Sequence, residues 1–399
     1  MKGGIQKMEN VNYEHVWLVV IAGGKGTRLF LFSNSYCPKQ FCQMDEDSTF
    51  IQATIARFLA LGIDPRHIVV VVTNEIQRQL SIEQVVDNFK VLSDNIILID
   101  PGHGYAGAML VATSFINQQD GDAIIIQTPS DQYVEQCNDF KSCVEKGIEV
   151  CRNGNPVIIG KRITNADVAK ELGNIIYSPE DGDLSHRIED FIEKPNIETI
   201  SQIMRTKSSA CNTGINIWKS NMIGQYQDNT PIATDTLINE ILIEPRVIIG
   251  TFGWEDCGTF KALYQLNRLK NNNNVIGLSN ANNIEYKDCG DALLITESTI
   301  ELDVYGVSKV AIVAREIDNE YYLEIASFDA VEGVAKAAEL FESCPTLFKE
   351  GVTIGGKNNG FTCPQPDKYH VCFIGVSGYK VNTYNRRSGK RGFNISKGI

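Results

Sequence analysis

The chain has 399 residues, 43% of them hydrophobic and 22% charged, and a formal net charge of −12. That length allows two domains with a substantial core, and the acidic excess argues against nucleic-acid binding, which needs basic surface to neutralise phosphates. No apolar run approaches the ~20 residues that span a bilayer, and the polar first ten residues lack the apolar core of a signal peptide, so we expect a cytoplasmic protein without a membrane partner.

The cysteines point to the same compartment. There are 11, an odd number, and they show no paired CxxC spacing. In a cytosolic protein such cysteines are most simply reduced, buried small hydrophobes. With only five histidines, none of which clusters with several cysteines, a zinc site is the weaker interpretation.

The glycine-rich stretch near the N-terminus is the first candidate site. Apolar and β-branched residues 16–21 predict a buried strand, which runs directly into Ala22-Gly23-Gly24-Lys25-Gly26-Thr27-Arg28. Glycines let backbone N–H groups approach an anion closely, and Arg28 and Lys39 add positive charge. The spacing is neither that of the P-loop nor that of the dinucleotide fingerprint. It predicts a phosphate cradle, with a plain strand-to-helix turn as the alternative.

The next elements alternate between helix and strand. Helical patterns cover residues 50–59, 75–90 and 106–115, and near-continuous apolar runs cover 67–72, 95–99 and 122–127. This alternation predicts a parallel sheet buried on both faces, with ligands beyond the carboxyl ends of its strands. Asp131 follows the last of these strands. It is either a helix cap or a Mg²⁺ ligand, because Mg²⁺ prefers oxygen donors such as carboxylates.

From residue 156 the pattern changes to strands without intervening helices. Short apolar runs cover residues 156–160, 171–177, 186–195 and 212–218, which suggests a mixed sheet. Four consecutive asparagines at 271–274 mark a linker, followed by β-like runs at 288–295 and 302–314 and an amphipathic helix at 330–341. After residue 346 nine Lys/Arg face only two acidic residues, so we expect a partly ordered basic tail whose removal leaves catalysis largely unchanged.

The glycine stretch and the Pro38-Lys39-Gln40-Phe41 that follows it resemble the G-G-x-G-T-R-L…P-K-Q-F pattern of the sugar-1-phosphate nucleotidylyltransferases. The likeness is greatest to the mannose-1-phosphate guanylyltransferase group. It implies a Rossmann-like, mostly parallel α/β nucleotidyltransferase domain over residues 1–268. A small β-rich module over 275–345 and a basic tail of unknown structure over 346–399 would follow.

The resemblance also implies roles for individual residues. Asp131 matches the first metal-binding aspartate of the family, and Asp256, in Trp254-Glu255-Asp256-Cys257-Gly258, matches the second. The nucleotide would bind Ala22, Gly23, Gly24, Gly26, Thr27, Arg28, Lys39, Pro101, Gly102 and Ala106. The sugar phosphate would bind Glu171 and Gly173, Glu193 and Lys194 of the Glu-Lys-Pro motif, and Asn212. Arg28, Lys39, Asp131 and Asp256 would be catalytic.

The implied reaction is the transfer of a nucleotidyl group from an NTP, GTP in the closest group, to a hexose 1-phosphate such as mannose 1-phosphate. GDP-mannose and pyrophosphate would be the products, Mg²⁺ the cofactor and the two substrates the partners. Five positions depart from the family pattern: Leu31, Asn34, His103, Gly104 and Gln132. They leave open another base, another sugar (glucose or a heptose) and a non-catalytic paralogue. Whether the protein forms a homodimer is also open.

Overall fold

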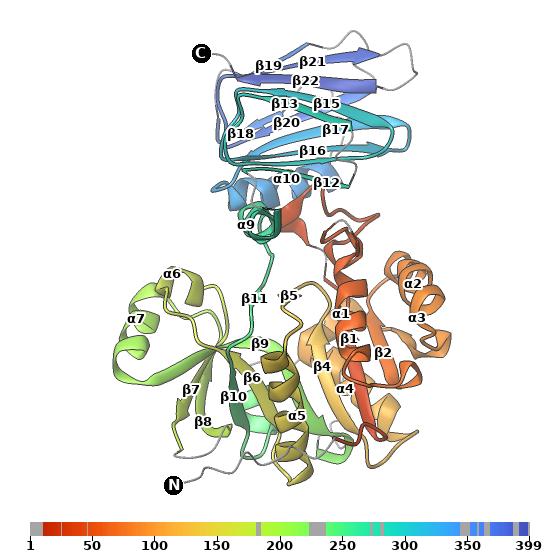
Figure 1. Ribbon diagram of the computed structural model, residues 1–399, viewed down its shortest axis with the longest axis vertical. Coiled ribbons are helices and arrows are strands. Elements are labelled where there is room, and N and C mark those ends of the chain that lie inside the picture. Colours follow the sequence, from red (N-terminus) through yellow and green to blue (C-terminus); the bar gives the residue numbers. More distant parts are fainter. Residues whose placement is uncertain are drawn as a thin grey trace. The chain divides into compact units, whose positions relative to one another are not determined.

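The computed structural model describes residues 11–24, 26–45, 47–180, 185–222, 237–271, 274–279, 283–343, 352–356, 359–362, 368–385 and 391–397. It divides into two compact units (Figure 1). Unit 1 comprises Met1–Gly23 and Ile51–Trp254, and unit 2 comprises Gly24–Phe50 and Glu255–Ile399. No helix in the described part of the chain is long and apolar enough to cross a membrane.

Unit 1 is built on a nine-stranded sheet with the order β3-β2-β1-β4-β9-β6-β10-β8-β7. Strands β1, β2, β3 and β4 are parallel, whereas β9 is antiparallel to both of its neighbours in this order. The bounds are β1 (Val16–Ile21), β2 (Ile68–Val72), β3 (Ile96–Leu98), β4 (Ile124–Pro129), β6 (Val157–Lys161), β7 (Asn174–Ser178), β8 (Ser185–Ile192), β9 (Ser208–Lys219) and β10 (Arg246–Gly250). The expected parallel α/β arrangement with a mixed second half is confirmed.

Helices flank this sheet (Figure 1), and α4 (Gly104–Asn117) buries its apolar face in the core against it. Its alanines and Met109 are buried, and Thr113 accepts a hydrogen bond from the buried Trp218 indole at 3.1 Å. The expected helix over 75–90 is interrupted by a π-helical turn and ends at Lys90 in a left-handed conformation. The helices are α1 (Phe50–Leu59), α2 (Glu75–Ser81), α3 (Asp87–Phe89), α4 (Gly104–Asn117), α5 (Asn138–Arg152), α6 (Ala166–Ala169) and α7 (Ile197–Thr206). Two short strands, β5 (Tyr133–Val134) and β11 (Trp254–Glu255), complete this part of the chain.

Unit 2 contains two sheets that the chain enters alternately. Val275 pairs in parallel with Ala292, and Ala292 with Val310, so each turn of the chain adds one strand to the first sheet. The intervening strands pair in the second sheet, and the two inner faces share an apolar core. This is a solenoid of β-coils. Its first strands are β12 (Val275–Ser279), β13 (Ile284–Lys287), β14 (Ala292–Thr296), β15 (Ile300–Tyr305) and β16 (Val310–Ile317).

The C-terminal part of the chain forms a second run of coils in the same two sheets. Strand β17 (Glu320–Ser327) runs antiparallel to β16, and β20 then pairs in parallel with β17. The last strand, β22, lies between β15 and β21. The strands are β18 (Val352–Ile354), β19 (Gly360–Thr362), β20 (Tyr369–Ile374), β21 (Tyr379–Asn385) and β22 (Arg391–Lys397), preceded by helix α10 (Val331–Ser343).

The structure therefore differs from the division expected from the sequence. Residues after 346, expected as a basic tail, contribute buried Phe373, Phe393 and Ile395 to the core of unit 2. The lysines and arginines hid the apolar pattern from the sequence analysis. In a strand, alternate residues point to opposite faces, so basic and buried apolar residues can follow one another. Of the nine basic residues, 349, 357, 386, 387 and 390 lie outside the described residues.

The glycine-rich stretch also falls on the other side of the expected boundary. From Gly24 to Phe50 the chain belongs to unit 2, where the ring of Phe30 lies 5.3 Å from that of Phe341 on α10. Helix α9 (Phe260–Asn271) holds the same segment, since Asn267 donates to the carbonyl of Met44 at 3.4 Å. The boundary expected at residue 268 lies instead at Trp254 and Glu255.

Because β22 lies inside a sheet, its core residues should be needed for stability. We expect Phe393→Ala to lower the free energy of unfolding of unit 2 by about 3–5 kcal/mol, as buried aromatic truncations do. Chemical denaturation of the full chain measures this. Lys380→Ala, at an exposed position of β21, is the control and should change it by less than about 0.5 kcal/mol. Equal, small effects would contradict the pairing of the C-terminal strands.

A buried carboxyl on β17 predicts a pH effect. Glu324 is fully buried, neither carboxyl oxygen has a hydrogen-bond partner among the described residues, and burial raises its pKa well above the usual value. The folded protein thus keeps a proton that the unfolded chain releases, so stability falls as pH rises above the unfolded value of about 4.3. Glu324→Gln should remove this loss, and its stability gain over the native chain should grow from pH 5 to pH 8 in denaturation curves. A pH-independent difference would contradict the argument.

Candidate active site

The carboxyl ends of the parallel strands in unit 1 bring the first predicted residues to one edge. The N–H of Ala22 donates to the carbonyl of Val71 at 2.8 Å, and the Ser130 hydroxyl donates to the carbonyl of Ile21 at 2.8 Å. These bonds join the ends of β1, β2 and β4. The chain therefore enters the glycine stretch beside the turn that carries Asp131.

Two side chains that the sequence analysis missed fix the start of the glycine stretch. The carbonyl of Gly23 accepts from Thr73 Oγ1 at 3.1 Å and from Gln77 Nε2 at 3.3 Å. Both donors follow β2, and Asn74 caps the helix by accepting from the N–H of Gln77 at 2.9 Å. A polar cluster directly after a buried strand was the available signal, because ligand sites gather at that edge.

The turn after β3 holds the predicted nucleotide residues Pro101 and Gly102. Asp100 accepts from the N–H of Gly102 at 2.7 Å, and its carbonyl lies 3.0 Å from His103 Nδ1. Gly104, one of the departures from the family pattern, has a positive φ of 64°, a conformation that favours glycine. Ala106, in the first turn of α4, is in contrast fully buried in the core.

A network of polar side chains lies under this edge and was not foreseen. Gln127 donates to the hydroxyl of Tyr105 and accepts from Asn216 Nδ2 at 2.7 Å. The Tyr105 hydroxyl donates to the carbonyl of Gly214 at 3.3 Å. The sequence signal for this network was the single glutamine within the apolar run of β4, because a buried amide needs hydrogen-bond partners.

Gln132 stands where the family pattern has histidine. Its Oε1 accepts from the indole nitrogen of Trp254 at 3.0 Å. The substitution therefore ties the Asp131 turn to the segment that precedes Asp256. Asp131 itself is half-buried.

The predicted sugar-phosphate residues converge in unit 1 from three separate motifs. The N–H of Asn212 donates to the carbonyl of Gly173 at 2.8 Å, and the N–H of Lys194 donates to that of Leu172 at 3.3 Å. A Cβ on Gly173 would lie 2.4 Å from the ring of Phe191 and 2.7 Å from a carboxyl oxygen of Glu193, so the ring leaves room only for glycine there. Glu171 is exposed beside this group.

Lys194 has a strained backbone at this point. Its φ is +44°, which a residue with a Cβ adopts rarely and at a cost of about 1–3 kcal/mol. Its side chain is 65% exposed, and its ammonium group lies 4.0 Å from the Glu193 carboxylate. The strained backbone thus lies where the three motifs converge, and the side chain that it carries is accessible to solvent.

The remaining predicted residues gather in unit 2. Arg28 Nη2 lies 3.7 Å from Asp256 Oδ2, and Lys39 Nζ donates to the carbonyl of Asp256 at 2.8 Å. Arg28 is exposed, whereas the Lys39 side chain is buried. A Cβ on Gly258 would lie 2.8 Å from the Asp256 carboxylate and 2.9 Å from the Arg28 guanidinium. A side chain at this position would therefore shift the ends of the Asp256 and Arg28 side chains. Lys25 lies outside the described residues.

The family model described as "Nucleotidyl transferase" matches residues 18–273, which is more than half of the chain. The chain belongs to this family. The resemblance inferred from the glycine stretch is thus confirmed at the level of the family, which is that of the sugar-1-phosphate nucleotidyltransferases.

Individual relatives are distant. Mannose-1-phosphate guanylyltransferase of Sinorhizobium fredii (strain NBRC 101917 / NGR234) is 24% identical over 331 residues, covering 74% of this chain but only 63% of that protein. The protein RfbM of Salmonella typhimurium, also named mannose-1-phosphate guanylyltransferase, is 24% identical over 356 residues, covering 80% and 71%. A structure named mannose-1-phosphate geranyltransferase, from Thermus thermophilus, is 21% identical with a TM-score of 0.66 and covers 82% of this chain and 99% of that one. It shares the fold.

The metal donors expected for this nucleotidyltransferase are Asp131 and Asp256. Among the described residues no group of three or more His, Cys, Asp or Glu side chains could hold a metal by itself. Carboxylates nevertheless suit Mg²⁺, which takes only one or two of them and completes its shell with substrate phosphates and water. The loose 3.7 Å contact with Arg28 fits a carboxylate of that kind. Burial and the neighbouring Asp256 raise the pKa of the adjacent Glu255.

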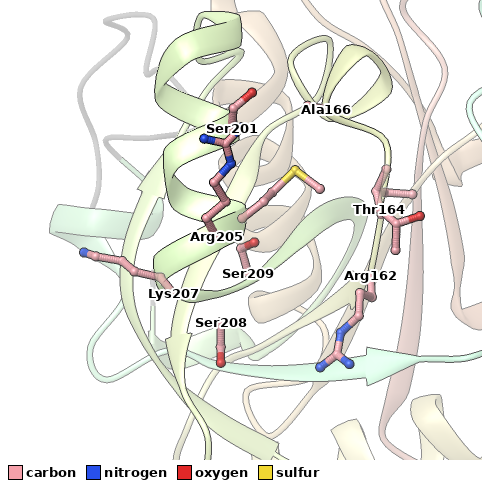
Figure 2. Close-up of a pocket in the computed structure, with 10 residues that line it drawn as sticks. Arg162, Thr164, Ala166, Ser201, Arg205, Lys207, Ser208 and Ser209 are labelled. Atoms are coloured by element: carbon pink, nitrogen blue, oxygen red, sulfur yellow. The ribbon is translucent and has the colours of Figure 1, made fainter.

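A separate pocket of about 520 Å³ lies in unit 1 between α7 and the segment before α6. Figure 2 shows Ser201 and Arg205 on the helix and Arg162 and Thr164 on the facing segment. Arg205 and Lys207 form no ion pair with any described residue. None of the residues predicted for nucleotide or sugar lines this pocket, so it is distinct from both groups described above.

The glycine stretch provides a matched pair of substitutions. A Cβ at Gly26, which has φ +66°, would lie 2.4 Å from Ser33 Oγ and 2.7 Å from Lys39 Cβ, whereas a Cβ at Gly24 would meet nothing within 4 Å. We expect Gly26→Ala to destabilise unit 2 by about 1–3 kcal/mol, from backbone strain and overpacking. Gly24→Ala should be close to neutral. Denaturation curves of both variants provide the comparison, and equal effects would contradict the assigned geometry.

Proposed function

We propose that this nucleotidyltransferase transfers a guanylyl group from GTP to mannose 1-phosphate, giving GDP-mannose and pyrophosphate. The observation that carries the proposal is the grouping of the predicted residues within each unit. Gly173, Glu193, Lys194 and Asn212 meet in unit 1, and Arg28, Lys39 and Asp256 meet in unit 2. The names of the relatives support guanine and mannose for this chain.

The chemistry asks mainly for positioning and charge neutralisation. The sugar phosphate oxygen attacks the α-phosphorus in line, the bond to the pyrophosphate oxygen breaks, and pyrophosphate leaves. The nucleophile is already anionic, so the step requires no general base. Lys194 orients the attacking phosphate, because its ammonium group is exposed on a fixed backbone. Arg28 and Lys39 hold the triphosphate and offset the charge that develops on the leaving group.

The nucleotide's base and ribose are assigned to the edge after β1 and β3, through Gly23, Gly24, Pro101 and Gly102. Asp131 and Asp256 are the carboxylates that would hold Mg²⁺. When bound, the ion would neutralise charge on the phosphate oxygens. In this proposal both aspartates bind the same ion, and binding requires each of them.

Some departures from the family pattern have structural explanations. Asn34 accepts from the N–H groups of Tyr36 and Cys37 at 2.9 and 3.0 Å, so it closes a turn. Leu31 is buried with φ +60°. His103 and Gly104 lie in the turn assigned to the base, and they favour the second candidate, a nucleotidyltransferase of the same fold with another base or sugar. The cytoplasmic location and the homodimer remain predictions.

The test is an assay of pyrophosphate release with each NTP against a panel of sugar 1-phosphates. We expect Mg²⁺-dependent turnover, greatest with GTP and mannose 1-phosphate. Greater turnover with another pair would support the second candidate. If no pair is turned over, the protein is instead a non-catalytic paralogue.

Substitutions of the aspartates test the metal assignment. Asp131→Asn and Asp256→Asn should each lower kcat at least about 100-fold, because each removes a charged donor at nearly constant volume. Asp167→Asn, on the exposed surface of α6, is the matched control and should leave kcat unchanged. Near-native activity of either aspartate variant would remove that residue from the metal site.

A further inference from the structure

A pair of thiols lies in the segment of unit 2 that carries Lys39. Cys37 and Cys42 are five residues apart, and their sulfur atoms are 3.5 Å from each other. A single turn over Lys39–Phe41 brings them together, since the N–H of Cys42 donates to the carbonyl of Lys39 at 3.0 Å. Cys42 is buried, whereas Cys37 is partly exposed. Cys37 is therefore the thiol of the pair that lies nearer to solvent.

The surroundings make the two thiols chemically unequal. The buried Cys42 Sγ lies 2.9 Å from the carbonyl oxygen of Phe32. Arg315 donates to the same carbonyl at 3.1 Å and to Glu297 at 2.7 Å, which fixes its guanidinium beside the thiols. A hydrogen bond from Cys42 and the charge of Arg315 outweigh burial and lower the pKa of Cys37 to about 7. Burial and the neighbouring Cys37 raise the pKa of Cys42.

Other described thiols lack this arrangement. Burial raises the pKa of Cys143 to about 11 and those of Cys151 and Cys211 to about 12. A protonated, buried thiol is a poor nucleophile, because the thiolate is the reactive form. The combination of a reactive, accessible sulfur with a second sulfur at 3.5 Å distinguishes the Cys37–Cys42 pair.

We propose that Cys37 and Cys42 are an oxidative modification site, at which a peroxide forms a disulfide across the Lys39 turn. The Cys37 thiolate attacks a peroxide oxygen, the O–O bond breaks, and with one proton the products are a Cys37 sulfenic acid and water. The Cys42 sulfur then attacks the sulfenic sulfur, an S–S bond forms, and the second oxygen leaves as water with the thiol proton. The peroxide is reduced by two electrons and the dithiol is oxidised by two.

The disulfide would change the turn between the two cysteines. The sulfur atoms must move from 3.5 Å to about 2.05 Å, the length of an S–S bond. Pro38 and Lys39 lie inside the closed ring, and Lys39 Nζ donates to the carbonyl of Asp256. The change therefore displaces Lys39. This consequence for activity rests on the proposed function, whereas formation of the disulfide does not.

The experiment treats the full-length, reduced protein with graded hydrogen peroxide and maps its tryptic peptides without reduction. Cleavage after Lys39 separates the two cysteines, so the disulfide appears as residues 29–39 joined to residues 40–57. We expect this joined pair to form before other cysteines are modified and to disappear with dithiothreitol. Cys37→Ser and Cys42→Ser should each abolish it. Cys137→Ser, a serine at a helix N-cap, is the control that should retain it.

The possible results separate the modification from its consequence. Prior oxidation of other cysteines, or sulfinic acid at Cys37 without the joined pair, would overturn the site. If the pair forms and turnover falls at least about fivefold, with recovery after reduction, the whole proposal stands. A pair that forms with unchanged turnover would overturn the displacement of Lys39. If the protein turns over no substrate pair at all, the proposed function fails, and the peptide map still decides on the modification site.

Discussion

The position of β1 between two parallel neighbours inside its sheet is the constraint on which the rest of the molecule depends. It pairs in parallel with β2 on one side and β4 on the other, in a register that aligns Ile21 with Val71 and with Pro129. The three strands therefore end at one edge. The chain must leave the sheet there, and after the buried Ala22 it continues with Gly23 and Gly24, which carry no side chain into the available space.

A second consequence is the separation of roles along the chain. The same stretch that begins at the sheet edge continues into unit 2, where Arg28 and Lys39 find Asp256. The charged residues are thus held by the β-coils and α10, and the backbone of the sheet edge is held by Thr73 and Gln77. Stability of the C-terminal coils and placement of the cations are therefore linked properties.

Much of the first half could be predicted from the sequence, because its strands are continuous apolar runs and its helices have a clear period. The fold class and the family followed from those runs and from the motif around Gly23. The C-terminal coils could not be predicted in the same way. Their strands pair with partners far away in the chain, as Glu301 does with Gly392, and basic residues on the outer positions obscured the alternation. A count of charged residues over the segment ignores the difference between the buried and exposed faces of a strand. Such a count therefore predicts a basic tail.

The candidate site was predictable where backbone geometry dictates the residue and less so where side chains support one another. Gly173 has no room for a Cβ beside the ring of Phe191, which leaves a glycine in the sequence. The network of Tyr105, Gln127 and Asn216 depends on contacts between separate elements, and no local pattern reports them. Gln132 shows the intermediate case, in which the departure was visible but its partner Trp254 was not.

The chain passes from one unit to the other at three places: after Gly23, after Phe50 and after Trp254. No single cut of the gene can therefore separate the units. A shortened chain that ends at Trp254 would keep the sheet but would also keep Gly24–Phe50 without the helix and strands that pack it. Exchanging the β-coils between relatives would require moving Gly24–Phe50 with them. Although the molecule has two compact units, segments of both alternate along the chain, so the gene segments that encode them must be kept or exchanged together.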